Sequence, residues 1–272
     1  DAELYFEIDW PALEETLADP STRLLHFCSP HNPVGRCWTR PELARVARLC
    51  VAHDVFICSD EVWGELPLDP TDHPFISMLA LITETSAEVE GDPDPEATHG
   101  VDGLLERLIV LTSPSKCFNV ASLDLALAIV PDESLLRKVR NCGRDAAEVT
   151  VFGYAAALAA YSDPESELWR KRCVNYLRTN REFAVDVLSS IEGMRVVRPE
   201  ASYLMWIDAT DALPPGTNAE SFFLEAGVGL TGGGSFGAGA GTCRLNFGCR
   251  RETLEEGLRR VVCAIEAINH NV

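Results

Sequence analysis

Three short polar segments of this chain each follow directly on an apolar run, and they contain Asn32, Asp60 and Lys116. The segments are SPHNPVG (29–35), SDEVW (59–63) and TSPSK (112–116). A lysine amine can act as a nucleophile or move a proton, and a carboxylate or an amide can orient a bound group. Each residue alone also has a simpler interpretation. Asn32 with the following proline is typical of a turn, Asp60 could cap a turn, and Lys116 could be solvent-exposed.

The apolar runs before these segments are predicted strands. They are RLLHF (23–27), VFICS (55–59), LIVLT (108–112) and LALAIV (125–130). Between the first two, Thr39 and Glu42 form a capping box with Pro41 between them, and apolar residues recur at helical spacing, so a helix is predicted over 40–53. Alternating apolar strands and helices predict an α/β sheet covered on both faces. Ligands bind at the strand ends of such sheets, where the three polar segments are expected to converge.

The second half of the chain has a different pattern. Helices are predicted over 133–143, from there to Tyr161, over 165–191 and at the C-terminus, with strands at 194–197, 202–208 and 243–247. This pattern indicates a smaller α+β domain. With a boundary near Asp163-Pro164, the predicted domains are 1–163, a large domain, and 164–272, a small one.

Composition limits the possible partners. The net charge of -19 disfavours nucleic acid, since phosphate binding needs clustered Lys and Arg. No apolar stretch approaches the length of a membrane span, and the N-terminus lacks the features of a signal peptide, so we expect a cytoplasmic protein. The ten cysteines contain no C-x-x-C pair and are predicted to be buried, reduced thiols. The acidic stretch 83–102 is predicted to be a solvated loop.

Three further sequence patterns do not indicate functional sites, because the residues or elements that each would need beside it are absent from the sequence. Gly227 to Gly232 matches the dinucleotide pattern G-x-G-x-x-G, but more glycine follows it where a helix is required. Gly233 to Gly237 matches the nucleophile pattern G-x-S-x-G without a helix after the serine or a partner histidine downstream. Cys28 and His31 have a metal-like spacing, but no second pair completes a set of four ligands, so no metal site is predicted.

Taken together, Asn32-Pro33-Val34-Gly35, Asp60 and Lys116 resemble the pyridoxal-phosphate enzymes of aminotransferase class I/II. The resemblance implies fold type I, the aspartate aminotransferase-like fold, with a mostly parallel sheet in its large domain and a smaller α+β C-terminal domain. It also implies pyridoxal 5'-phosphate as cofactor, a small amino-acid substrate and a homodimer.

The resemblance assigns roles residue by residue. Lys116 would bind the cofactor aldehyde and move protons, Asp60 would pair with the pyridine nitrogen, and Asn32 would meet the ring hydroxyl. Ser113 matches a phosphate ligand and Ser115 is a weaker candidate. In CRLNFG, Arg244 matches the arginine that holds the substrate carboxylate through a bidentate pair.

PHNPVGRCWTRPEL, TSPSKCFNVASL and RLNFGCRRETLEEGLRR resemble most closely the cystathionine β-lyase-like carbon-sulfur lyases. That branch removes the α-proton of a cysteine S-conjugate and expels a thiolate, leaving pyruvate and ammonia. Two positions depart from the family pattern. Trp63 stands where a tyrosine or histidine is common, and Asp124 stands where an arginine often faces the phosphate.

Family members carry roughly a hundred residues before the point that corresponds to Asp1, so a fragment of a longer enzyme is expected. The alternative is a naturally truncated chain with an incomplete cofactor site. Three alternatives stay open at this point. One is an aminotransferase, another is a specialised amino-acid deaminase or decarboxylase, and the third is a catalytically incomplete partner subunit of a full-length homologue.

Overall fold

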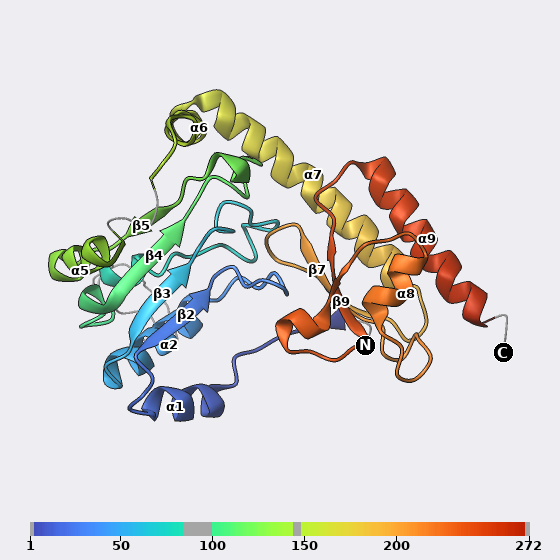
Figure 1. Cartoon of the computed structure of the whole chain (residues 1–272), viewed down its shortest axis with the longest axis horizontal. Helices are drawn as coiled ribbons and strands as arrows, with labels where there is room; N and C mark the ends of the chain where they lie inside the picture. Colours follow the sequence, from blue (N-terminus) through green and yellow to red (C-terminus); the bar gives the residue numbers. More distant parts are fainter. Residues whose placement is uncertain (1–2, 84–99, 144–147, 270–272) are drawn as a thin grey trace. The chain divides into compact units, whose positions relative to one another are not determined.

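The structure is a computed structural model that describes residues 3–83, 100–143 and 148–269. The chain divides into two units (Figure 1). The N-terminal unit consists of Glu7–Pro30 and Cys37–Lys171, and the C-terminal unit consists of Asp1–Phe6, His31–Arg36 and Arg172–Val272. The last boundary between the units, after Lys171, falls within one long helix, α7 (Pro164–Ser189). The domain boundary at residue 163 stays a prediction.

The N-terminal unit is built on a sheet of four strands in the order β2-β3-β4-β5 (Figure 1). The strands are β2 (Leu24–Cys28), β3 (Phe56–Asp60), β4 (Leu108–Thr112) and β5 (Leu127–Ile129). The first three are parallel, and β5 pairs with β4 in the antiparallel direction. The predicted mostly parallel sheet is therefore confirmed, and its four strands lie where the apolar runs placed them.

Helices surround this sheet. They are α1 (Trp10–Ala18), α2 (Arg40–Ala52), α3 (Ala80–Thr83), α5 (Glu133–Gly143), α6 (Val151–Ser162) and the start of α7, with 3-10 turns at Leu105–Arg107 and Ala121–Leu123. The predicted capping box of α2 is present, with the Thr39 amide donating to Glu42 Oε2 at 2.7 Å. Helix α1 was not predicted, although Asp9 caps it by accepting a hydrogen bond from the Ala12 amide at 3.1 Å.

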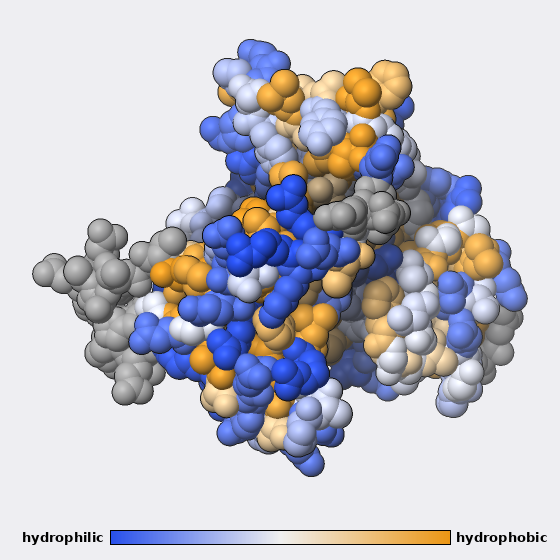
Figure 2. Space-filling model, turned by 60° about the vertical axis from the view of Figure 1, so that its left-hand side comes forward, coloured by the Kyte–Doolittle hydropathy of each residue, from blue (hydrophilic) through white to orange (hydrophobic). Residues whose placement is uncertain are grey.

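Helix α6 carries large apolar side chains that face solvent in this chain. Val151, Phe152, Tyr154 and Leu158 are 82%, 74%, 66% and 69% exposed. Figure 2 shows apolar residues gathered at the top of the view, the height at which Figure 1 draws α6. Exposed apolar surface of this kind commonly marks an interaction face.

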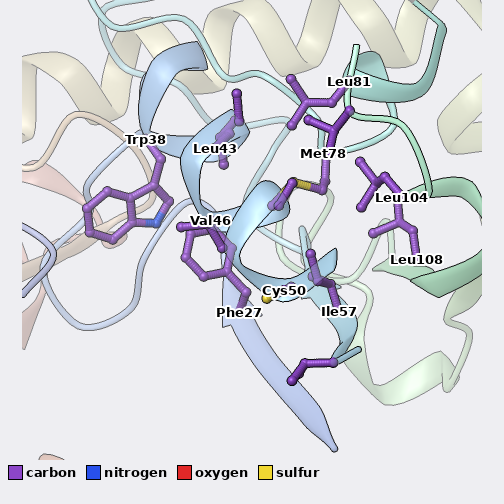
Figure 3. Packing of buried hydrophobic residues seen from close by; sticks show 14 of the residues in the cluster. Phe27, Trp38, Leu43, Val46, Cys50, Ile57, Met78, Leu81, Leu104 and Leu108 are labelled. Carbon is purple, nitrogen blue, oxygen red and sulfur yellow. The ribbon is translucent and has the colours of Figure 1, made fainter. Parts of the chain in front are cut away.

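The core of the N-terminal unit lies between α2 and the sheet (Figure 3). Leu43, Val46 and Cys50 of α2 are fully buried against Ile57 of β3 and Leu108 of β4. Burial of each large apolar side chain stabilises the fold by about 1.5–3 kcal/mol. This packing fixes β3, which ends at Asp60, and β4, which precedes Lys116.

The C-terminal unit has a mixed sheet in the order β1-β6-β7-β9-β8. Its strands are β1 (Glu3–Leu4), β6 (Arg195–Val197), β7 (Leu204–Asp208), β8 (Thr231–Gly232) and β9 (Thr242–Asn246). Its helices are the rest of α7, α8 (Ala219–Glu225) and α9 (Arg251–Asn269), with a 3-10 turn at Gly233–Phe236. Strands β1 and β8 have two residues each and helix α8 has seven, so they were too short for their periodicity to predict them.

All ten cysteines are free. The prediction that they are buried holds for Cys37, Cys50, Cys117 and Cys243, is met only in part by Cys28, Cys58, Cys173 and Cys249, and is wrong for Cys142 and Cys263. Both are exposed on the outer faces of α5 and α9. The glycine-rich stretch after Gly227 leads into β8 and a 3-10 turn. Within the described residues, no helix has both the length and the apolar character that crossing a bilayer requires. Of the acidic stretch 83–102, residues 84–99 lie outside the described part of the chain.

Candidate active site

One edge of the N-terminal sheet carries Asp60 and Lys116. Strands β3 and β4 run parallel, with Asp60 opposite Leu111, so their carboxyl ends lie at the same edge. Asp60 is the last residue of β3, and Lys116 lies in the turn that follows β4. The sheet therefore places at one edge a carboxylate and an amine that are 56 positions apart in the sequence.

Strand β3 directs Asp60 and its neighbours to opposite faces. Ile57, Ser59 and Glu61 are buried, whereas Asp60 is only partly buried, as the alternation of a strand requires. The Asp60 carboxylate accepts a hydrogen bond from the Val62 amide at 3.2 Å, which holds the side chain close to its own backbone. One carboxylate of the Asp60-Glu61 pair thus reaches the sheet edge while the other enters the core.

Lys116 lies over an aromatic ring. Its Nζ atom is 5.7 Å from the centre of the Trp63 ring, and Trp63 is 5% exposed. A cation–π contact of this kind contributes about 0.5–1 kcal/mol at an open site. No ion pair of Lys116 is found among the residues that the structure describes. The chain has two other lysines, Lys138 and Lys171, and both are exposed on helices.

The turn that carries Lys116 is held by hydrogen bonds within the loop. The Ser113 hydroxyl donates to the Leu125 carbonyl at 2.6 Å and accepts from the Ser115 amide at 3.1 Å. The Phe118 amide donates to the Pro114 carbonyl at 2.9 Å, which closes the turn around the lysine. Ser113 is therefore engaged within the turn, and a phosphate contact from its hydroxyl would require that hydroxyl to rotate.

Glu61 is a buried residue that the sequence analysis missed. Its Oε1 atom accepts hydrogen bonds from the Ser59 hydroxyl at 2.9 Å and the Met78 amide at 2.8 Å. Burial raises the pKa of the Glu61 carboxyl, and the hydrogen bonds that it accepts oppose this shift. The strand period was the available signal, since it predicts that the residue after Asp60 points inward. Glu61 fixes the segment that follows β3.

A second missed group surrounds Cys117, the residue after the lysine. Cys117 is 3% exposed, and its thiol and Glu65 are hydrogen-bonded to each other. Burial raises the pKa of Glu65, and Arg170 opposes that shift while donating to the Glu65 carbonyl at 3.0 Å. Burial also raises the pKa of Tyr161 to about 12. These residues come from three distant segments, so no local pattern could have grouped them.

The C-terminal unit holds the other two candidate residues, and they are in contact. Arg244 Nη1 donates to Asn32 Oδ1 at 2.8 Å, and Nη2 donates to the Thr231 hydroxyl at 3.4 Å. The Arg244 guanidinium also lies 5.0 Å from the centre of the Phe236 ring. Burial lowers the pKa of Arg244, but an arginine in a protein remains charged. Two residues more than two hundred positions apart thus form one anion-binding candidate.

The last position of Asn32-Pro33-Val34-Gly35 requires a glycine for steric reasons. Gly35 has φ +72°, and an added Cβ would lie 2.5 Å from the Pro199 Cβ. Its carbonyl accepts hydrogen bonds from the Glu200 and Ala201 amides, both at 3.0 Å. A side chain at this position would displace the loop that presents Asn32 to Arg244.

The predicted site residues are thus distributed over the two units. Asp60, Trp63, Ser113, Ser115 and Lys116 belong to the N-terminal unit, and Asn32 and Arg244 belong to the C-terminal unit. Asp124, at the position where the family often has an arginine, is exposed. The role of each residue stays a prediction.

Comparison with known proteins identifies relatives over nearly the whole chain. The family model for aminotransferase class I and II matches residues 2–261. Cystathionine beta-lyase PatB of Bacillus subtilis (strain 168) is 32% identical over 266 residues, which cover 96% of this chain and 62% of PatB. Aspartate aminotransferase of Geobacillus stearothermophilus is 25% identical, covering 97% of this chain and 62% of that protein.

The fold also matches solved structures. Cystalysin from Treponema denticola, whose crystal structure contains a pyridoxal 5'-phosphate cofactor, superposes with a TM-score of 0.83 at 26% identity. The match covers 97% of this chain and 62% of cystalysin. The chain therefore spans less than two thirds of the length of these relatives.

Proposed function

Because this chain belongs to the aminotransferase class I and II family, we propose that the protein is a pyridoxal-phosphate-dependent carbon-sulfur β-lyase. Its substrate would be a cysteine S-conjugate, and its products a thiol, pyruvate and ammonia. The observation that carries this proposal is the common edge of β3 and β4, which presents Asp60 and Lys116 together. The similarity to cystathionine beta-lyase PatB supports elimination as the reaction.

The residues at this edge fit the cofactor. When bound, pyridoxal phosphate withdraws electrons from the α-carbon of an amino acid, which makes the α-proton acidic. Lys116 has an amine without an ion-pair partner among the described residues, as a lysine that binds an aldehyde requires. Asp60 would hold the pyridine nitrogen in its protonated form. The resemblance to the family assigns Asn32, a residue of the C-terminal unit, to the ring hydroxyl. Ser113 and Ser115 would contact the phosphate.

Lys116 would also move the protons of the elimination. In this step, the Cα–H and Cβ–S bonds break, a carbon-carbon double bond forms, and the sulfur leaves with the electron pair. The Lys116 amine accepts the α-proton, and the resulting ammonium can deliver a proton to the departing sulfur. The released enamine then takes up water and gives pyruvate and ammonia. Trp63 can donate one N–H hydrogen bond in the site but cannot transfer a proton.

Arg244 would hold the substrate α-carboxylate, since a guanidinium matches a carboxylate with two parallel hydrogen bonds. We expect Arg244→Lys to raise KM for the substrate about tenfold to a hundredfold, because a lysine keeps the charge but loses the bidentate geometry. Steady-state kinetics with S-methyl-L-cysteine measure this effect. Arg178→Lys, at an exposed position of α7, is the matched control and should leave KM unchanged. A wild-type KM in Arg244→Lys would remove this residue from the substrate site.

Product analysis tests the reaction itself. The protein is incubated with pyridoxal phosphate and L-cystathionine or S-methyl-L-cysteine, and pyruvate and thiol are measured in parallel. We expect pyruvate and thiol in equal amounts without an added keto acid. If turnover instead requires 2-oxoglutarate and yields glutamate, the protein is an aminotransferase, like the relative from Geobacillus. Carbon dioxide release would indicate a decarboxylase. Activity only in the presence of a full-length homologue would indicate a partner subunit.

We also propose that two copies of the protein associate through the exposed face of α6, which carries Val151, Phe152 and Leu158. Burying these side chains against a second copy would remove apolar area from water. We expect Leu158→Asp to weaken dimerisation about tenfold or more, because a charge would be buried in the interface. Light scattering across a concentration series measures the change, with the exposed Lys171→Asp as control. Equal dimerisation of Leu158→Asp and wild type would place the interface elsewhere.

The free cysteines support a reducing cellular compartment as the location of this activity. All ten cysteines are free, and burial raises the pKa of Cys50 and Cys243 to about 12. A thiol with such a pKa stays protonated and unreactive at neutral pH. On this basis we propose a cytoplasmic location, where thiols remain reduced.

A further inference from the structure

The C-terminal unit contains a cavity of about 600 Å³ that the proposed reaction does not use. It lies among β7, β9, α8 and α9, the orange and red elements of Figure 1. Its walls are mostly apolar and include Ile207, Phe223, Leu245, Leu254, Leu258 and Val261. Asn32 and Arg244 are not part of its lining. A volume of this size is typical of sites for small molecules, which occupy about 300–1,000 Å³.

A glycine in the middle of a helix keeps this cavity wide. Gly257 lies within α9 and lines the cavity, and a Cβ added to it would meet no atom within 4 Å. A glycine inside a helix costs about 1 kcal/mol relative to alanine. Neither a left-handed backbone nor a close neighbour requires a glycine at this position. The effect of Gly257 in this fold is to leave space in the cavity.

A second glycine has the same property on a different segment. Gly229, in the loop between α8 and β8, also lines the cavity, and its added Cβ would likewise meet nothing within 4 Å. By contrast, Gly227 has φ +80° and an added Cβ would lie 2.7 Å from Arg260 Nη1, so a glycine is required there. Gly229 and Gly257 therefore widen the cavity from two sides. Neither the backbone conformation nor a close neighbour requires a glycine at either position.

The charges at the cavity mouth are already paired. Arg260 Nε donates to Glu256 Oε1 at 2.7 Å, and its Nη1 donates to the Gly227 carbonyl at 3.3 Å. Glu256 also accepts from Arg259 at 2.8 and 2.9 Å. Burial raises the pKa of Cys249, which keeps that thiol neutral. The other charged residue of the lining, Glu252, pairs with Arg250 at 3.7 Å. A charged ligand would therefore find no unpaired opposite charge in this lining, whereas a neutral one displaces only water from apolar walls.

We propose that this cavity binds a neutral, predominantly apolar small molecule. Its apolar part would fill the space beside Gly257, against Phe223 and Leu258. At the mouth, the Thr253 hydroxyl and the Asn246 amide offer hydrogen bonds to a single polar group. This site is independent of the proposed lyase reaction and can be tested without measuring activity.

The test uses N-phenyl-1-naphthylamine, a neutral apolar dye whose fluorescence rises on burial, titrated into the protein. We expect saturable binding with one site per chain. Gly257→Leu fills the cavity and should weaken binding about tenfold or more, while Gly257→Ala adds one methyl group and should stay within about threefold of wild type. Glu255→Leu adds the same side chain at an exposed position of α9 outside the cavity and should bind like wild type.

Folding of each variant is checked by circular dichroism and thermal melting. If Gly257→Leu does not fold, Gly229→Leu fills the cavity from the loop and should weaken dye binding in the same way. The proposal is overturned if wild type gives no saturable binding. It is equally overturned if a folded filling variant binds the dye as tightly as wild type, or if Glu255→Leu loses binding to the same extent.

Discussion

Replacing Lys116 with alanine is expected to lower kcat of the lyase reaction by about a thousandfold or more, because one side chain would supply both the covalent anchor and the proton transfer. The amine lies at the end of β4 over Trp63, at 5.7 Å from the ring centre, and the same sheet edge carries Asp60. Removing it leaves no other lysine amine at this edge, since Lys138 and Lys171 are exposed on α5 and α7. The measurement is pyruvate release under substrate saturation, with excess pyridoxal phosphate.

The chain provides matched controls for this substitution. Lys138→Ala and Lys171→Ala remove the same amine from exposed helical positions and should each retain wild-type kcat. Lys116→Arg keeps the positive charge over Trp63 but cannot form the bond to an aldehyde, so it should be as inactive as alanine. If Lys116→Arg is active, charge rather than covalent chemistry is what this position supplies.

Asp60→Asn is expected to lower kcat about a hundredfold or more. The amide has the shape of the carboxylate but no charge, and loss of a charged hydrogen-bonded partner costs about 2–5 kcal/mol. The hydrogen bond that the Val62 amide donates to the side-chain oxygen of residue 60, at 3.2 Å, can persist in the variant, so the fold should be unaffected. Kinetics together with the dissociation constant for pyridoxal phosphate separate weaker cofactor binding from slower chemistry.

Asp72→Asn makes the same chemical change at an exposed position and should leave kcat and cofactor affinity unchanged. A wild-type kcat in Asp60→Asn would mean that this carboxylate does not support the reaction. Reduced cofactor affinity with an unchanged kcat at saturation would limit Asp60 to binding the cofactor.

The strands that carry the site were predictable because they are long apolar runs ending in polar residues. Leu108–Thr112 and Phe56–Asp60 fall where the apolar runs placed them, since both lie inside a sheet with one face buried and the other partly buried. Helix α2 was equally clear from its capping box. In each case the local signal and the tertiary environment agree, which is why the prediction holds.

Contacts between distant segments were less accessible from the sequence. The hydrogen bond from Arg244 to Asn32 depends on the pairing of β9 with β8 and on the turn at Gly35, and neither is a local property. Likewise, Glu65 and Arg170 approach Cys117 only after the chain has folded. The resemblance to a family supplied the roles of Asn32 and Arg244, and the fold supplies their contact.

The most direct test of the proposed active site is to identify the residue that binds the cofactor. The protein is incubated with pyridoxal phosphate, reduced with borohydride and digested, and the modified peptide is identified by mass spectrometry. We predict that the added mass lies on Lys116. A modification found on Lys138 or Lys171 instead, or no modification at all, would contradict the proposal that the turn after β4 is an active site.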